Sequence, residues 1–318
     1  MKTPLLILLY NRPNVTKTLF NKIKKMKPST IYIAADGPRA NDPVDSELCN
    51  RVRNIFSKIN WNCKIYRKYN KKNFGCKNSI TKSIDWFFKR EKYGIILEDD
   101  CIPSLDFFWI TGILLKKYEN NNKIFCISGS NYTKNFKNDN NSYYFSKYPH
   151  CWGWATWRRA WRKNDPYIKF WPKFKNTLDW KSINNSITEN RYWNKIFDRC
   201  YKGKFNSWAY PWTLSVWKNK GLTIIPKENL VKNIGYGTNS TNSFFRDIGD
   251  IYKTKKIQRT IKHPKLIRPD VKKDNFVFNN HYRGKNYLYP YRIVFLIKMF
   301  ISNPLNFLKR AKNTLNQL

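Results

Sequence analysis

The feature that most constrains this chain is an apolar run that ends in three consecutive acids, Glu98, Asp99 and Asp100. The four residues before them, 94–97, read Gly-Ile-Ile-Leu, a pattern typical of a buried β-strand. Adjacent carboxylates repel one another, and a hard divalent cation is the partner that holds them together. Carboxylates at the C-terminal end of a strand, followed by Pro103 and a helical pattern, are typical of a metal and phosphate site at the edge of an α/β sheet. A solvated acidic turn is the alternative that this stretch alone leaves open.

The charge balance of the chain points to anionic partners. The 318 residues include 61 Lys and Arg against 21 Asp and Glu, a formal net charge of +40. This charge favours nucleic acid, anionic lipid or phosphate-rich substrates, although a general bias towards Lys and Asn is another origin for it. An apolar content of 41% with 17% aromatic residues supports a packed core and excludes a disordered polycation.

Cysteine spacing and the N-terminal residues indicate a cytoplasmic protein. The seven cysteines form no Cys-x-x-Cys pair and are odd in number, so neither a zinc site nor a disulfide framework is expected. The apolar run near the N-terminus is short and is followed by Asn11-Arg12-Pro13, so we expect a buried first strand and no signal peptide. No stretch of the sequence reaches the roughly 20 apolar residues of a transmembrane helix.

Residues 1–130 alternate strand and helix patterns, as a parallel sheet with crossover helices requires. The second expected strand ends in Asp36-Gly37, a turn with a carboxylate at its mouth. We expect strands at 5–9, 30–35, 61–66, 94–97 and 124–128, and helices at 15–26 and from 73 to 88.

The second half of the chain differs in composition, because residues 148–220 contain ten tryptophans. For any one of them, packing in the core is favoured over stacking on a sugar ring, since tryptophan is mostly buried in proteins. The tail, residues 289–318, mixes apolar and basic residues. It fits an amphipathic helix at a membrane interface, and it fits equally a helix that docks on the core.

The order of these signals resembles the nucleotide-sugar glycosyltransferases of the glycosyltransferase-A fold. Within them, the chain is most similar to N-acetylglucosaminyltransferases that carry Glu-Asp-Asp as their DxD-type metal motif. The resemblance covers residues 4–130 and continues more loosely through 152–157 and 226–235, blocks similar to those in bacterial relatives that build surface glycans. Its motifs are Asn11-Arg12-Pro13, Asp36-Gly37, Asn73-Phe74-Gly75, Glu98-Asp99-Asp100 and Asp106-Phe107-Phe108.

The resemblance implies an α/β fold of the glycosyltransferase-A type. Its sheet is mixed and mostly parallel, flanked by helices, with a Trp-rich acceptor half and a C-terminal helical tail. Residues 1–130 would form the nucleotide-sugar-binding half and residues 131–250 the acceptor-binding half of the same domain. Residues 251–318 would form a C-terminal extension that associates with a membrane.

The implied activity is metal-dependent transfer of a hexosyl or N-acetylhexosaminyl group from a UDP-linked donor to a surface glycan, with inversion. The acceptor is a glycan or a lipid-linked glycan, so the expected place is the cytoplasm, peripheral on the inner face of an anionic membrane. No nucleic-acid partner is expected. The alternatives are a basic nucleic-acid-binding protein and a non-catalytic glycan-binding relative.

Roles for five residues follow from the resemblance. Asp100 is the direct ligand of Mn²⁺ or Mg²⁺, Glu98 faces the donor sugar, and Asp99 faces the ribose. Asp36 contacts the nucleobase or the ribose. Arg12 holds the uracil edge or the diphosphate.

The catalytic base is where this chain departs from the family pattern. In relatives the base is an Asp in a Trp-flanked block, and the corresponding block here, residues 207–212, carries Ala209 where an acid is expected. Asp198 is the nearest upstream acid and our candidate for the base, with Asp165 and Glu189 as others. An ordinary surface or ion-paired role is the alternative for each. The histidine that sometimes supports the metal in relatives is replaced by polar residues at 238–242.

Overall fold

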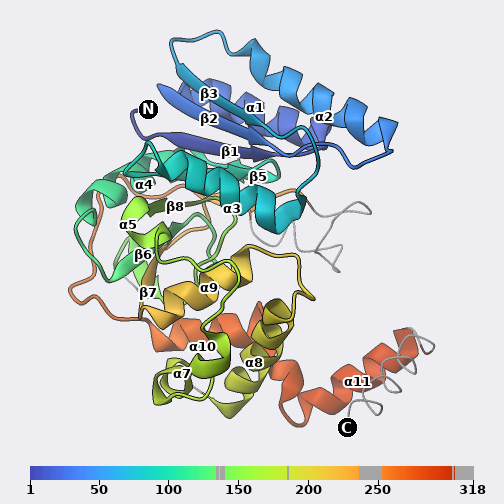
Figure 1. The fold of residues 1–318 in the computed structure, drawn as a ribbon. Helices are drawn as coiled ribbons and strands as arrows, with labels where there is room; N and C mark the ends of the chain where they lie inside the picture. Colours follow the sequence, from blue (N-terminus) through green and yellow to red (C-terminus); the bar gives the residue numbers. More distant parts are fainter. Residues whose placement is uncertain (134–135, 137–139, 185, 236–252, 303, 305–318) are drawn as a thin grey trace.

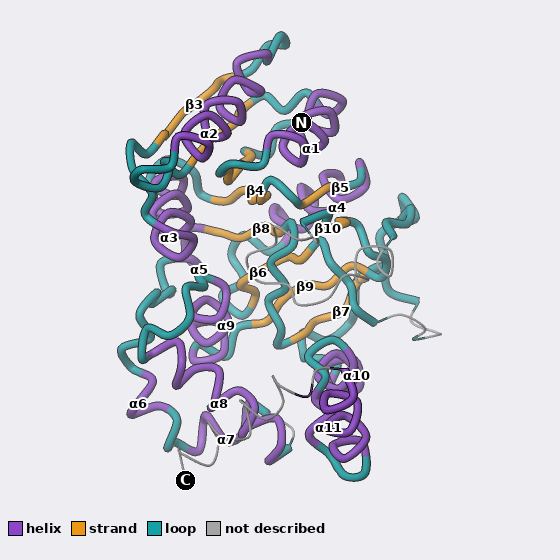
Figure 2. The backbone as a smooth tube through the Cα atoms, turned by 90° about the vertical axis from the view of Figure 1, so that its right-hand side faces the viewer, coloured by secondary structure: helices purple, strands orange, loops and turns teal. Residues whose placement is uncertain are grey.

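The computed structural model describes residues 1–133, 136, 140–184, 186–235, 253–302 and 304. An eight-stranded sheet forms its centre, and its strands follow one another from top to bottom in Figure 2. The first four strands are parallel, whereas β8 runs antiparallel to both of its neighbours and β7 runs antiparallel to β9. The prediction of a mixed, mostly parallel sheet is therefore confirmed. In spatial order the strands are β3 (Lys64–Tyr69), β2 (Thr30–Ala35), β1 (Leu5–Leu9), β4 (Tyr93–Glu98), β8 (Trp154–Trp157), β6 (Ile124–Ser128), β9 (Leu222–Pro226) and β7 (Tyr143–Ser146).

Of the five expected strands, three lie at the predicted residues, β4 extends one residue further at each end, and one is shifted. Strands β1, β2 and β6 match the expected ranges, but the strand expected at 61–66 is found as β3 at Lys64–Tyr69. The predicted strand begins too early because Trp61, which looks like a strand residue, lies in the preceding turn. Its indole donates to the carbonyl of Pro28 and packs beside Phe20, so its apolar side chain belongs to the core without belonging to the strand.

Helices cover both faces of the sheet because its central strands are apolar on both sides. Leu5 and Ile7 of β1 point into one core cluster, whereas Leu6 and Leu8 point into the other. The first cluster is covered by α1 (Pro13–Met26), α2 (Pro43–Ile55), η1 (Phe56–Lys58) and α4 (Leu105–Lys117). The second is covered by α3 (Gly75–Phe88), α8 (Ile187–Tyr201), α9 (Ala209–Lys218) and α10 (Val271–Asn280).

The Trp-rich segment builds much of the second cluster, together with the short helices α5 (Arg158–Trp161), α6 (Trp171–Phe174) and α7 (Leu178–Ile183). Nine of its ten tryptophans are 4% exposed or less, so the prediction that they pack in the core is confirmed for these nine. The tenth, Trp152, is partly exposed.

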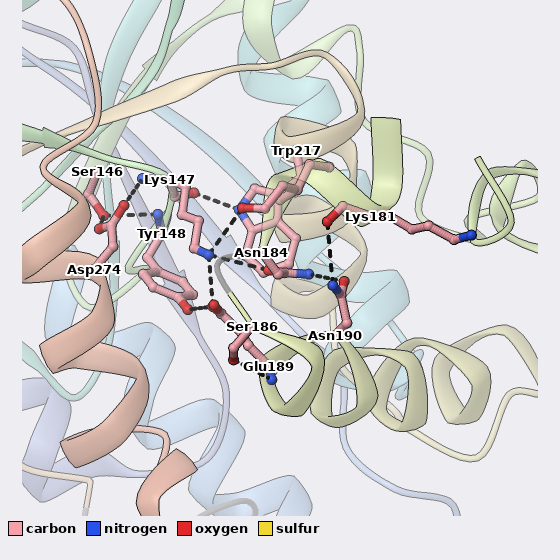
Figure 3. A network of polar contacts seen from close by, with 11 residues as sticks. Ser146, Lys147, Tyr148, Lys181, Asn184, Ser186, Glu189, Asn190, Trp217 and Asp274 are labelled. Atoms are coloured by element: carbon pink, nitrogen blue, oxygen red, sulfur yellow. Dashed lines mark hydrogen bonds and ion pairs between the residues drawn. The ribbon is translucent and has the colours of Figure 1, made fainter. Parts of the chain in front are cut away.

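A buried polar network ties this helical layer to the sheet (Figure 3). Lys147, just after β7, forms an ion pair of 2.8 Å with Glu189 of α8, and both side chains are almost fully buried. Tyr148 also donates to Glu189. On the other side of the loop, Asp274 of α10 accepts from the Ser146 hydroxyl and from the backbone N–H of Lys147. One loop therefore joins β7 to two helices that are distant in sequence.

The C-terminal extension begins as part of the body. The backbone N–H of Lys255 donates to Asn229, that of Ile257 to the carboxylate of Asp106, and that of Lys262 to the Ser142 hydroxyl. Beyond α10, the chain passes through η2 (Gly284–Tyr287) into α11 (Tyr291–Ser302), which projects away from the rest of the molecule in Figure 1. None of the helices among the described residues combines the length and apolar character of a membrane-spanning segment.

Candidate functional site

The C-terminal ends of three neighbouring parallel strands bring the predicted site residues to one edge of the sheet. Leu9 of β1 pairs with Ala35 of β2, and Leu8 of β1 pairs with Glu98 of β4. Arg12 and Asp36, which follow β1 and β2, therefore lie at the same edge as Glu98. Strand β1 lies between β2 and β4, with α1 on one face and α3 on the other, and open α/β sheets bind ligands at such a switch point.

Arg12 joins the acids across 87 residues of sequence. Its Nε donates to Oδ2 of Asp99 at 3.1 Å, and its Nη2 donates both to Oδ1 of Asp99 and to Oδ2 of Asp100, the latter at 3.0 Å. The Asp99 side chain is 3% exposed and that of Asp100 is 15% exposed. Asp99 is thus held by a two-point ion pair, and Asp100 is the acid of this pair that faces outwards.

One guanidinium does not balance three carboxylates. Burial, together with the charges of Asp100 and Asp99, raises the pKa of Glu98 to about 8. Burial also raises the pKa of Asp99, although Arg12 acts against this change. Burial alone would lower the pKa of Arg12, but the charges of Asp99 and Asp100 hold it above its ordinary value. A further positive charge beside Glu98 and Asp99 would act against these increases, because it favours the charged form of a carboxyl group.

Residues 207–212 correspond to the block that carries the base in the family that this chain resembles. One residue of this block, Trp208, lies near Glu98. The Trp208 side chain, at the start of α9, is near enough to Glu98 to lower its pKa, against the stronger effects that raise it. The loop before it is held on the first turn of α3, because the backbone N–H of Lys77 donates to Oδ1 of Asn206 at 3.1 Å. Ala209, the position where an acid is expected, is the first residue of α9.

A small second sheet covers the acids from another direction. Strand β10 (Val231–Asn233) runs antiparallel to β5 (Cys101–Pro103), and the backbone N–H of Ile234 donates to the carbonyl of Asp100 at 2.9 Å. Gly235 comes next, held by a hydrogen bond from its N–H to Oδ1 of Asn233. A Cβ at position 235 would lie 2.1 Å from Oδ2 of Asp100, so only glycine permits this approach. Residues 238–242, where relatives sometimes place a histidine, lie outside the described residues.

The carboxylate of Asp36 is already satisfied by the protein. It accepts hydrogen bonds from the backbone N–H groups of Gly37, Phe74 and Gly75 and from Nδ2 of Asn70, at 2.9 to 3.2 Å. Asp36 is 6% exposed and caps the N-terminus of α3. A contact with a ribose or nucleobase would have to share these carboxylate oxygens.

Asp45 positions the loop that carries Arg12, a role that the sequence pattern does not reveal. Asp45 is 2% exposed and accepts from the Tyr10 hydroxyl and Nδ2 of Asn11, each at 2.6 Å, and from the N–H of Arg39. Burial acts to raise the pKa of Asp45, but these hydrogen bonds hold it below its ordinary value. The sequence Asp42-Pro43 with Asp45 signals the start of a helix, as α2 indeed begins there, but it does not signal the contacts with residues 10 and 11.

The structure does not bring the candidate base to the acids. Asp198 lies on α8, where it accepts from Nε1 of Trp171 at 2.8 Å and from Nζ of Lys175 at 3.2 Å. Helix α8 lies well apart from β5 in both Figure 1 and Figure 2. Glu189 is engaged by Lys147, and Asp165 accepts from the backbone of Tyr167 and Lys169. Each of these acids has a structural partner.

No protein-family model matches the chain, and no curated protein matches its sequence. Solved structures with some likeness include a UDP-glucose pyrophosphorylase complexed with UDP-glucose, with 10% identity over 71% of this chain and 90% of that one and a TM-score of 0.35. Another is the 4-diphosphocytidyl-2C-methyl-D-erythritol synthase of Anaerococcus prevotii, with 11% identity over 62% and 84% of the two chains and a TM-score of 0.32. HddC from Yersinia pseudotuberculosis has 9% identity over 54% and 86%, with a TM-score of 0.31. At these identities and TM-scores the likeness supports no conclusion about activity, which rests on the geometry of the site.

Proposed function

We propose that this protein is a metal-dependent glycosyltransferase. It transfers a hexosyl or N-acetylhexosaminyl group from a UDP-linked donor to a surface glycan, with inversion. The observation that carries the proposal is the meeting of Arg12, Asp36 and the three acids at the carboxyl ends of β1, β2 and β4. An acidic turn that was merely solvated would not be buried against an arginine from another strand end.

The acids fit a divalent cation that is shared with the donor. Among the described residues no group of three or more His, Cys, Asp or Glu is arranged to hold a metal by itself. Mg²⁺ is commonly bound by one or two carboxylates together with substrate phosphates, and Asp100 supplies such a carboxylate. When bound, Mn²⁺ or Mg²⁺ would neutralise the charge of the departing nucleoside diphosphate.

The other residues bind and orient the donor in this proposal. Glu98 faces the donor sugar, with Trp208 beside it. Asp99, held by Arg12, faces the ribose. Asp36 positions the first turn of α3 beside the nucleobase and the ribose. Arg12 supplies positive charge to the diphosphate.

The base that takes the proton from the acceptor hydroxyl stays a prediction from the sequence. If Asp198 is this base, Asp198→Asn lowers turnover and leaves donor binding unchanged, as equilibrium dialysis with UDP would measure. A variant with wild-type turnover would reject Asp198.

A non-catalytic glycan-binding relative is the second candidate function. It is favoured by one observation, which is that the block facing Glu98 carries Ala209 in place of an acid. Hydrolysis of a UDP-sugar by the purified protein would reject this candidate. A nucleic-acid-binding role fits less well, because the buried acids at the sheet edge would repel a phosphate backbone.

We also propose that the protein works at an anionic membrane surface in the cytoplasm, where a lipid-linked glycan acceptor would lie. Helix α11 is unlike the docked helices, because Ile293, Val294 and Ile297 are 49%, 49% and 52% exposed. With about 100° between successive residues, positions 293, 294, 296, 297 and 301 lie within roughly half of the helix circumference. This apolar face on a strongly basic protein supports shallow insertion among anionic headgroups.

The proposal is tested by measuring the thermal stability of the protein with UDP and a panel of nucleotide sugars, with and without Mn²⁺. Binding raises stability by mass action, so Mn²⁺ should add to the stabilisation by UDP in the wild type and not in Asp100→Asn. Asp179→Asn is the matched control, since Asp179 is an exposed acid on α7. Stabilisation by UDP that does not depend on metal, together with tight binding of single-stranded nucleic acid at physiological salt, would reject the proposal.

A further inference from the structure

The two carboxylate oxygens of Asp100 have different surroundings. Oδ1 lies 3.5 Å from the thiol of Cys101, which is fully buried. Oδ2 lies 3.0 Å from Nη2 of Arg12 and directly beside Gly235. Arg12 therefore already holds the oxygen of Asp100 that does not face the buried thiol.

The contacts of Arg12 are unequal. Nε and Nη2 together hold Asp99 in a two-point ion pair, whereas Asp100 receives only a second hydrogen bond from Nη2. A divalent cation on Oδ2 of Asp100 and the guanidinium of Arg12 would repel each other at this distance. Releasing Asp100 costs Arg12 one contact and leaves the ion pair with Asp99 in place.

We infer that Arg12 occupies the metal-binding oxygen of Asp100 in the donor-free protein, so that Arg12 and the divalent cation compete for it. This inference rests on the proposed function. The diphosphate of the donor resolves the competition, because it gives Arg12 another anion to bind. Metal and nucleoside diphosphate therefore bind cooperatively, and the metal alone binds weakly. Because coupling between two ligands is reciprocal, the metal must strengthen nucleotide binding by the same factor.

The test measures the binding of Mn²⁺ itself, by electron paramagnetic resonance of the free ion, without any assay of activity. In the wild type, a saturating concentration of UDP should tighten Mn²⁺ binding by roughly 10-fold or more. In Arg12→Gln, Mn²⁺ should bind more tightly than in the wild type when UDP is absent, and UDP should tighten it by a smaller factor than in the wild type, because only the shared phosphates then couple the two ligands. Arg51→Gln, which removes the same charge from an exposed position on α2, should behave as the wild type.

Arg12→Lys is a second variant, used in case Arg12→Gln does not fold. It keeps the positive charge but cannot form the two-point ion pair with Asp99. It should show intermediate Mn²⁺ affinity. Weaker binding of Mn²⁺ to both Arg12 variants without UDP would overturn the inference, because Arg12 would then support the metal. Equal binding to the wild type with and without UDP would overturn it as well. If the wild type binds no Mn²⁺ even with UDP, the proposed function fails together with the inference.

Discussion

At the scale of single residues, the candidate site depends on a close approach between two backbone segments. Gly235 lies so near Asp100 that a side chain there would overlap the carboxylate. The carboxylate of Asp100 also meets Arg12, so its position is set from two sides. A methyl group at position 235 would have to move the acid or the arginine.

We predict that Gly235→Ala displaces the carboxylate of Asp100 and weakens Mn²⁺ binding in the presence of UDP. Changes to residues that orient a metal ligand typically cost about 10- to 100-fold in metal affinity. Isothermal titration with Mn²⁺ measures the change. Gly112→Ala on α4 is the control, because a Cβ there meets only the Thr3 hydroxyl, at 3.2 Å. Unchanged Mn²⁺ affinity in Gly235→Ala would contradict the prediction.

At the scale of elements, the loop after β7 connects the sheet to α8 and α10 through buried charges. Lys147 and Glu189 neutralise each other, and removing one partner of such a buried pair usually destabilises a protein by several kcal/mol. Asp274 accepts hydrogen bonds within the same loop. Burial raises its pKa to about 6, although these hydrogen bonds and the charge of Lys147 act against the change.

The raised pKa of Asp274 makes stability depend on pH. Between pH values of about 4 and 6 the folded state binds a proton at Asp274 that the unfolded state has released, so the free energy of unfolding falls as pH rises through this window. From the ordinary value of 3.8 to about 6, the loss is about 3 kcal/mol at roughly 1.4 kcal/mol per unit. This loss of stability is complete above the pKa of Asp274 in the folded state.

Asp274→Asn removes this titration. Urea unfolding at pH values from 4 to 7 should therefore show the wild type losing stability relative to Asp274→Asn as pH rises. The charges that face Asp274, Lys147 and Glu189, are present in both proteins and largely cancel. A stability difference that stays constant over the window would contradict the prediction, and Asp179→Asn, an exposed change, should give such a constant difference.

At the scale of the whole molecule, basic charge and one projecting helix act together. The first part of the C-terminal extension packs on the body, whereas α11 has its main contacts with η2 and exposes Ile293, Val294 and Ile297. Attraction to anionic headgroups is worth about 1 kcal/mol for each basic residue near the surface, so a few of the 61 suffice.

We predict salt-sensitive binding of the full-length protein to vesicles that contain phosphatidylserine, measured by flotation. The double variant Ile293→Glu/Ile297→Glu should lose most of this binding, as should deletion of residues 289–318. Leu178→Glu is the control, because Leu178 is 82% exposed on another helix. If the wild type does not bind such vesicles at low salt, the proposal of membrane association is rejected.

Local pattern alone was enough to place several elements of this protein. The apolar runs at β1, β2 and β6 lie where they were predicted, and the acids lie at the end of β4, with Glu98 as its last residue. These features depend on each residue and its near neighbours, since alternation, turn residues and caps act over a few positions. The partial miss at β3 has the same origin, because an apolar residue beside a strand looks like part of it.

Tertiary structure decided the composition of the site. Arg12 and Asp99 are 87 residues apart, Trp208 lies beside Glu98 although they are distant in sequence, and Gly235 follows a strand whose three residues give little local signal. The antiparallel strand β8, inserted between β4 and β6, was also not predictable from its own residues. Such contacts depend on which strand ends share an edge and which loops pack over them. This arrangement of strands and loops forms because it buries the apolar surface of the whole chain. No short stretch of sequence holds the information needed to predict it.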